Sequence, residues 1–198
     1  MTEWAENISR AILQTALPRR WAHTRQVAAV AERLRPVLRE DTDLLTAAAW
    51  LHDIGYGPAL ASVGYHPLDG ARYLRDVERA DGMLCRLVAH HSCAVIEAEE
   101  RGVAAELIAE FEPAPPYLAD ALIYCDMASG PDGQPMTVAE RLAEITNRYG
   151  PADVVSRAIA RSAPLLTAAA GRVRQRIAEH DAGHEPGCPG KVLAAAVC

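Results

Sequence analysis

The order of histidines and aspartates along the chain constrains its fold more than any other feature of the sequence. Five histidines and two aspartates follow one another as His23, His52-Asp53, His66, His90-His91 and Asp126. Most of them fall on stripes of helical periodicity whose other members are apolar, so they are expected to face a hydrophobic core. A neutral imidazole is tolerated there, but burial of an unpaired carboxylate costs several kcal/mol. The fold must therefore place a compensating charge beside these side chains.

The remaining sequence predicts an all-α fold. The chain is rich in Ala, Leu, Arg and Glu, which favour helices, and it lacks alternating β-branched runs. Helices are expected near 3–17, 18–34, 42–53, 67–77, 82–92, 94–110 with a break near Gly102, 117–128, 137–149, and 152–180 with a break at Pro164. Pro18 suits the first turn of a helix. Thr137 and Glu140 form a capping-box pattern.

Length and composition indicate a single-domain helical bundle. With 198 residues, 50% of them hydrophobic and 23% charged, the chain suits one domain, which we place at 1–182. Residues 183–198 hold three glycines and two prolines and are expected to form a loosely ordered tail. No apolar run reaches the roughly 18 residues of a membrane span, and the acidic N-terminus does not resemble a signal peptide. These features predict a soluble cytoplasmic protein.

Charge and cysteine content narrow the classes of partner. The net charge of -6, without a basic stripe, argues against binding of long nucleic acids, although a local cationic site is compatible with a small phosphorylated ligand. Three of the five cysteines, Cys85, Cys93 and Cys125, sit in helical, partly apolar stretches and are expected to be reduced thiols. No Cys-x-x-Cys pair is present, so zinc-finger and redox motifs are weak interpretations.

Two of the polar positions stand out on apolar stripes. His23 lies on one stripe with Val27 and Val30, at spacings of four and three. Asp126 follows Leu122 in the same way and is the odd member of its stripe. A single histidine on such a face is more often a hydrogen-bonded core residue than a ligand. Several core-facing polar positions in one short helical chain are harder to explain as independent accidents.

The adjacent pairs can be separated by the same geometry. His52 belongs to the apolar stripe of its helix, and Asp53 follows at the helix end, where a short side chain can swing inward. His91 follows Leu87 at a spacing of four and should face the core, whereas His90 leans toward the rim. We therefore expect His91 to be a metal ligand and His90 to contact substrate or line the pocket wall. A solvated surface position is the alternative for His90.

The chemistry of these side chains predicts a divalent metal site. Imidazole and carboxylate without thiolate suit iron, manganese, zinc, nickel or magnesium, and three or more histidines argue against magnesium alone. Six ligands exceed the four of a structural zinc site. The set fits two octahedral ions per chain, bridged by an aspartate, with open positions left over.

These residues bring the chain to a known family. It resembles the HD-domain superfamily of metal-dependent phosphohydrolases over roughly residues 19–150. The matching segments are Arg20-Trp21-Ala22-His23, Leu51-His52-Asp53-Ile54-Gly55, His66-Pro67-Leu68-Asp69-Gly70-Ala71, Val88-Ala89-His90-His91-Ser92 and Tyr124-Cys125-Asp126-Met127. The resemblance implies an all-α HD-domain bundle.

The resemblance also implies roles for individual residues. His23, His52, Asp53 and Asp126 match the primary metal ligands of the family, and His66 and His91 match the additional histidines of its two-metal members. Many members carry a lysine after the His-Asp-Ile-Gly run, where this chain has Tyr56. The Gly-Tyr-Pro motif of the cyclic-dinucleotide phosphodiesterases is missing after the histidine pair, which argues against that branch.

The expected activity is hydrolysis of a nucleotide or another small phosphate ester, with Asp53 and His52 as catalytic residues. Arg20, or alternatively Arg19, is expected to neutralise phosphate charge, and Tyr56 to contact substrate. Two alternatives remain open, a mixed-valence di-iron oxygenase and a non-catalytic sensor module. The loop 129–135 is either a lid or a simple connector, and the apolar stripe of 137–149 is a core or dimer contact, which leaves a homodimer possible.

Overall fold

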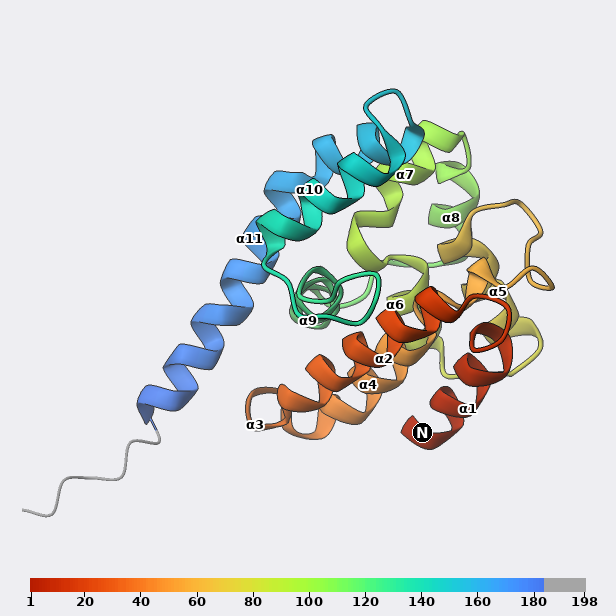
Figure 1. Ribbon diagram of the computed structural model, residues 1–198. Helices are drawn as coiled ribbons and strands as arrows, with labels where there is room; N and C mark the ends of the chain where they lie inside the picture. The colour runs from red at the N-terminus through yellow and green to blue at the C-terminus, as the bar shows by residue number, and fades with distance from the viewer. Residues whose placement is uncertain (184–198) are drawn as a thin grey trace, which may run out of the picture.

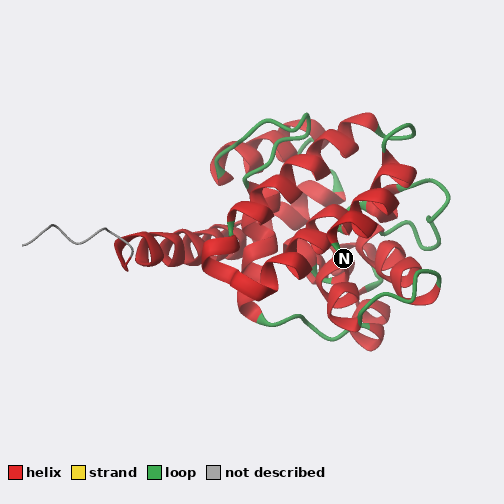
Figure 2. Cartoon of the chain, turned by 90° about the horizontal axis from the view of Figure 1, so that it is seen from below, coloured by secondary structure: helices red, strands yellow, loops and turns green. Residues whose placement is uncertain are grey.

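The computed structural model describes residues 1–183, and these form an all-α protein. The α-helices are α1 (Thr2–Leu13), α2 (Pro18–Arg33), α3 (Arg35–Leu38), α4 (Thr42–Leu51), α5 (His66–Asp76), α6 (Gly82–Ala89), α7 (Ala94–Arg101), α8 (Ala104–Glu110), α9 (Pro116–Met127), α10 (Val138–Tyr149) and α11 (Val154–Gly183). Three short 3-10 helices join them, η1 (Arg39–Asp41), η2 (Ile54–Tyr56) and η3 (His91–Cys93). Within residues 1–183 there is no strand, as Figure 2 shows.

The helices pack around two connected apolar cores. The larger core lies among α1, α2, α4, α5, α6 and α9, with α2 and α4 side by side in Figure 1. The smaller core joins α9, α10 and α11, through residues such as Ile145 and Leu166. Tyr124 of α9 packs against both cores, so this helix connects them. The apolar stripe of α10 is therefore a core contact with α11.

Local signals fix several helix starts. Helix α2 begins at Pro18, as predicted, because proline has no N–H to lose in the first turn. The residue before it, Leu17, has φ -139° and ψ 66°, outside the helical region that proline disfavours for its predecessor. The predicted first helix therefore ends early, at Leu13 and not at Leu17. The Thr137–Glu140 capping box is confirmed at the start of α10.

The predicted break at Pro164 is wrong, because α11 runs unbroken from Val154 to Gly183. Proline removes one hydrogen bond, the one to the carbonyl of Ala160, and that loss is local. Buried residues on both sides of it, Ser162 and Leu166 among them, keep the helix packed against the body. Beyond Val173 no residue of α11 up to Gly183 is buried, and Figures 1 and 2 show this end projecting from the bundle.

Three further expectations concern the periphery. Cys85, Cys93 and Cys125 are free thiols, as predicted. No helix among residues 1–183 is both long and apolar enough to cross a membrane. The expected tail begins at Gly183, which the structure places as the last residue of α11, and residues 184–198 lie outside the described part of the chain.

Candidate metal centre

Six histidine and aspartate side chains converge where α2, α4, α5, η3 and α9 meet. They form two groups, each with ligand atoms within 4.8 Å of one another. The first group is His23, His52 and Asp126, and the second is Asp53, His66 and His91. All six are buried except His66, which is partly exposed. The structure thus brings together all six side chains that the sequence analysis assigned to a metal site.

Asp53 lies between the two groups and presents one carboxylate oxygen to each. Its Oδ2 is 3.3 Å from Nε2 of His52 and 3.8 Å from Nε2 of His23. Its Oδ1 is 3.4 Å from Nε2 of His66 and 3.8 Å from Nε2 of His91. This is the arrangement expected of a carboxylate that bridges two cations.

Backbone carbonyls fix the tautomer of three of the rings. Nδ1 of His23 donates to the carbonyl of Gly130, at 3.1 Å. Nδ1 of His52 donates to Ala49 and Nδ1 of His91 to Val88, each at 2.7 Å. A carbonyl oxygen only accepts, so Nδ1 carries the proton and the Nε2 lone pair is left for a cation. Such outer hydrogen bonds are typical of metal-binding histidines.

Buried atoms of the first group lack the partners that burial demands. Nε2 of His23, Nε2 of His52 and Oδ1 of Asp126 have no hydrogen-bond partner among residues 1–183. The first and last are 3.1 Å apart, but their geometry does not make a hydrogen bond. An unsatisfied buried acceptor costs about 1–3 kcal/mol, so one divalent ion bound to these three atoms would remove that cost. The donor set therefore fits a metal ion.

The electrostatics of the site also suit a cation. Burial lowers the pKa of His23, His66 and His91, so these rings are neutral near pH 7. Burial opposes the ionised form of Asp53, but the Arg20 guanidinium and the imidazoles of His52 and His66 together outweigh it and hold the pKa of that carboxyl well below its ordinary range. Neutral imidazole and ionised carboxylate are the forms that bind metal.

At the other two ligands the charged neighbours together outweigh burial. Burial opposes ionisation of Asp126, but His23, His52 and Arg141 together lower the pKa of this carboxyl. Burial opposes protonation of His52 as well, yet the carboxylates of Asp53 and Asp126 together raise the pKa of this imidazole. A cation that binds Nε2 of His52 therefore competes with a proton at this ring.

The second group depends on close packing of η2 against α5. A Cβ at Gly55 would lie 2.0 Å from the carbonyl oxygen of His66 and 2.7 Å from the amide nitrogen of Gly70, both backbone atoms. Only glycine at position 55 permits this approach. The carboxylate of Asp69 accepts hydrogen bonds from three successive backbone N–H groups, of Val63, Gly64 and Tyr65, and so orders the loop that leads into His66.

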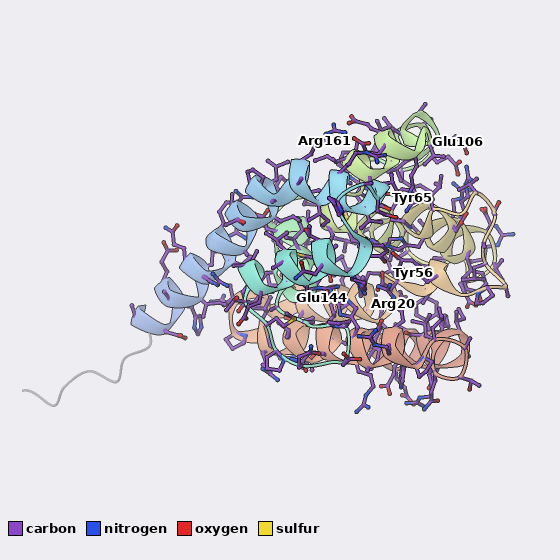
Figure 3. The ribbon with its side chains drawn as sticks, turned by 45° about the horizontal axis from the view of Figure 1, so that its top comes forward. Arg20, Tyr56, Tyr65, Glu106, Glu144 and Arg161 are labelled. Atoms are coloured by element: carbon purple, nitrogen blue, oxygen red, sulfur yellow. The ribbon has the colours of Figure 1, made fainter. Side chains whose placement is uncertain are left out.

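A small cavity opens beside the two groups, and its volume is about 80 Å³. Arg20 and Tyr56, both predicted to contact substrate, line it. The Tyr56 ring stacks on His66 with centroids 3.9 Å apart, and the Arg20 guanidinium lies 4.0 Å from the centre of the Tyr56 ring on the same stack. Figure 3 shows Arg20 and Tyr56 next to each other near Glu144 of α10. Nη1 of Arg20 also donates to Asp53, at 2.6 Å.

The remaining predicted residues lie elsewhere. His90 is not among the residues that line this cavity, because its Nε2 donates to the carbonyl of Phe111, 2.7 Å away. Arg19 forms a surface ion pair with Asp132, so Arg20 and not Arg19 reaches the metal ligands. The loop that contains Gly130 and Asp132 packs on α2 and holds the His23 ring through the Gly130 carbonyl.

Sequence reasoning did not find several residues of the site. Ser92 donates from Oγ to Oδ2 of Asp126, and its backbone is in the left-handed region at φ 50° and ψ 41°. Arg141, Arg148 and Tyr149 of α10 line the cavity. A signal for Arg141 was present, since it falls between Val138 and Ile145 on the buried stripe of α10.

The family of the chain follows from comparison with known proteins. The model of the HD domain matches residues 20–149, more than half of the chain, so the chain belongs to the HD domain family. This family suggests a metal-dependent, hydrolase-type function, and the two groups described above are candidate sites for its divalent metals. Neither the curated proteins nor the solved structures contain a match to the chain.

Proposed function

We propose that the protein is a metal-dependent phosphohydrolase that binds two divalent ions and hydrolyses a small phosphate ester. The observation that carries this proposal is the position of Asp53, whose two oxygens face separate groups of ligands. A single-ion site needs no carboxylate with this double contact. The all-nitrogen-and-oxygen donor set is compatible with iron, manganese, nickel or zinc.

Divalent ions in such a site lower the pKa of a bound water and polarise a phosphoryl oxygen. The chain itself holds and orients the reacting groups. Asp53 and His52 lie at the junction of the two groups, 3.3 Å apart at their nearest ligand atoms, and we assign both to the catalytic machinery. Arg20 neutralises charge on the substrate from the wall of the cavity, and Tyr56 holds Arg20 against the site.

The direct test is metal content of purified protein, measured for wild type beside His66→Ala and His91→Ala. We expect about two ions per chain in wild type and about one in each variant, because each substitution removes a ligand of the second group only. His90→Ala is the matched control, since His90 is next to His91 in sequence but its own ring is hydrogen-bonded to the Phe111 carbonyl outside the cavity. One ion or none in wild type, after incubation with manganese, iron and nickel, would contradict the binuclear site.

Activity is tested on the metal-loaded protein with a panel of phosphate esters. We expect phosphate release by wild type and a loss of at least about a hundredfold in Asp53→Asn, which removes the charge of the bridging ligand at nearly constant volume. Phosphate release that is unchanged in Asp53→Asn would refute the assignment. No phosphate release, together with substrate-dependent oxygen uptake by the iron-loaded protein, would favour an oxygenase instead.

A further inference from the structure

We propose that Arg141 of α10 binds the anionic head group of the substrate, and that the substrate is a compact phosphomonoester and not a nucleotide. The proposal rests on the proposed function, whose metal site it extends to a residue outside the ligand set. Arg141 is buried, with 4% of its surface exposed, and it lines the cavity beside the two groups of ligands. It comes from a helix that the sequence analysis assigned to packing alone.

The hydrogen bonds of Arg141 leave part of its guanidinium free. Nη1 donates to Glu144, one turn further along α10. Nη2 lies 3.9 Å from Oδ1 of Asp126, too far for a hydrogen bond. Nε is buried and has no partner among residues 1–183. A buried guanidinium with unused donors is costly unless an acceptor is present, and two oxygens of a phosphoryl group can accept hydrogen bonds from its Nε and Nη2 side by side.

The other two arginines of the cavity have no such unpartnered buried nitrogen among residues 1–183. Arg20 donates to Asp53, and Arg148 lies 3.4 Å from Glu144 through Nε. The residues that line the cavity include three arginines and three carboxylates, so any divalent ion bound there leaves the cavity with net positive charge. That charge favours an anion, and Arg141 can donate hydrogen bonds to it beside Asp126, in addition to the charge that Arg20 neutralises.

The size of the cavity limits what the anion can be attached to. Its volume of about 80 Å³ compares with roughly 30 Å³ for one water in the liquid and with roughly 300 Å³ or more for sites that enclose drug-sized ligands. A phosphoryl group with a short body fits this space. The wall away from the metal ligands is apolar, formed by Ile145, Val155 and Ile159. A nucleoside is too large to be enclosed in this volume.

The test measures binding of inorganic phosphate to the manganese-loaded protein by calorimetry. We expect Arg141→Met to weaken phosphate binding by about 10- to 100-fold, the loss expected for charge-assisted hydrogen bonds, and Arg141→Lys to fall between Met and wild type. Arg161→Met is the control, because Arg161 forms surface ion pairs with Glu99 and Glu100 and does not line the cavity; Figure 3 shows it apart from Arg20 and Tyr56. Wild-type phosphate affinity in folded Arg141→Met that still holds two ions would overturn the proposal.

The size of the ligand is tested by competition, which does not require turnover. In competition with phosphate, glycerol 2-phosphate should bind the wild-type protein with at least about tenfold higher affinity than adenosine monophosphate. Equal or stronger displacement by adenosine monophosphate would overturn the compact substrate. If phosphate binds through Arg141 but no ester is hydrolysed, the proposed function fails while the anion site stands. A wild-type protein that binds no metal, together with phosphate affinity that is unchanged in Arg141→Met, would contradict both the proposed function and the anion site.

Discussion

The close approach of Gly55 to α5 allows a prediction in which packing decides metal binding. In Gly55→Ala the new Cβ would lie 2.0 Å from the carbonyl oxygen of His66, about 1 Å inside the shortest distance that real Cβ contacts reach. The obstructing atoms are backbone atoms of His66 and Gly70, so no side-chain rotation relieves the clash. The start of α5 must therefore move away from η2 by about 1 Å, and His66 moves with it.

Two magnitudes follow from this displacement. Overpacking of this kind costs about 1–3 kcal/mol of unfolding free energy, which lowers the melting temperature by roughly 2–12 °C for a chain of this length. Metal ligands tolerate shifts of only about 0.2 Å, so a shift of about 1 Å removes His66 from the second group and leaves the first group intact. We expect Gly55→Ala to be folded and to hold one ion per chain.

The assay combines circular dichroism, thermal unfolding and elemental analysis of the purified variant. Gly82→Ala is the control, because a Cβ at Gly82 would meet no atom within 4 Å. A Gly55→Ala protein with wild-type melting temperature and two ions per chain would refute the reasoning from the backbone contact. A protein with a lower melting temperature and two ions would refute only the link between packing and the second group.

Three further predictions follow from individual contacts. Ser92→Ala should lose about 1.5–3 kcal/mol of unfolding free energy in urea, because it loses the hydrogen bond to Asp126. Ser92→Gly should lose about 1 kcal/mol less, because glycine relieves the strain of the left-handed backbone, and equal losses in the two variants would argue against that strain. Asp69→Asn should cost about 2 kcal/mol in the same assay, since the carboxamide has one acceptor oxygen for three N–H groups, and an unchanged urea midpoint would contradict this role. Gly171→Ala, on the exposed side of α11, should raise the melting temperature by roughly 1–4 °C, because alanine restores about 0.5–1 kcal/mol of helix propensity; a decrease would indicate a contact at this face.

Helix starts were predictable because their signals are local. Pro18 and the Thr137–Glu140 pair act within one turn, so the sequence alone identified both. Helix ends were less predictable, as Leu13 and Pro164 illustrate. The effect of Pro164 depends on how firmly α11 is packed on both sides of the proline, and that packing comes from segments distant in sequence.

The site divides in the same way. Periodicity in the sequence singled out His23, His52, His91 and Asp126, and the family resemblance added Asp53 and His66. Ser92 owes its position to the left-handed turn after His91, which no periodicity encodes. Arg141 lies on the buried stripe of α10, but only the docking of that helix brings it to the cavity. His90 differs from His91 only in direction, and its partner, the Phe111 carbonyl, lies in the loop after α8. The sequence alone could identify the six candidate metal ligands, whereas the residues that surround them could be identified only from the tertiary structure.

The dispersal of the ligands over the chain has a consequence for folding. His23 comes from α2 near the beginning of the domain and Asp126 from the end of α9, and the other four lie between them. The first group cannot assemble until α9 has docked against α2 and α4, so no early fragment of a growing chain contains a complete site. An ion present at 100 times its dissociation constant then adds about 2.7 kcal/mol to the folded state alone. Metal available during synthesis would thus stabilise only chains that have folded completely, and a chelator would remove this stabilisation and raise the unfolded fraction that proteases can cleave.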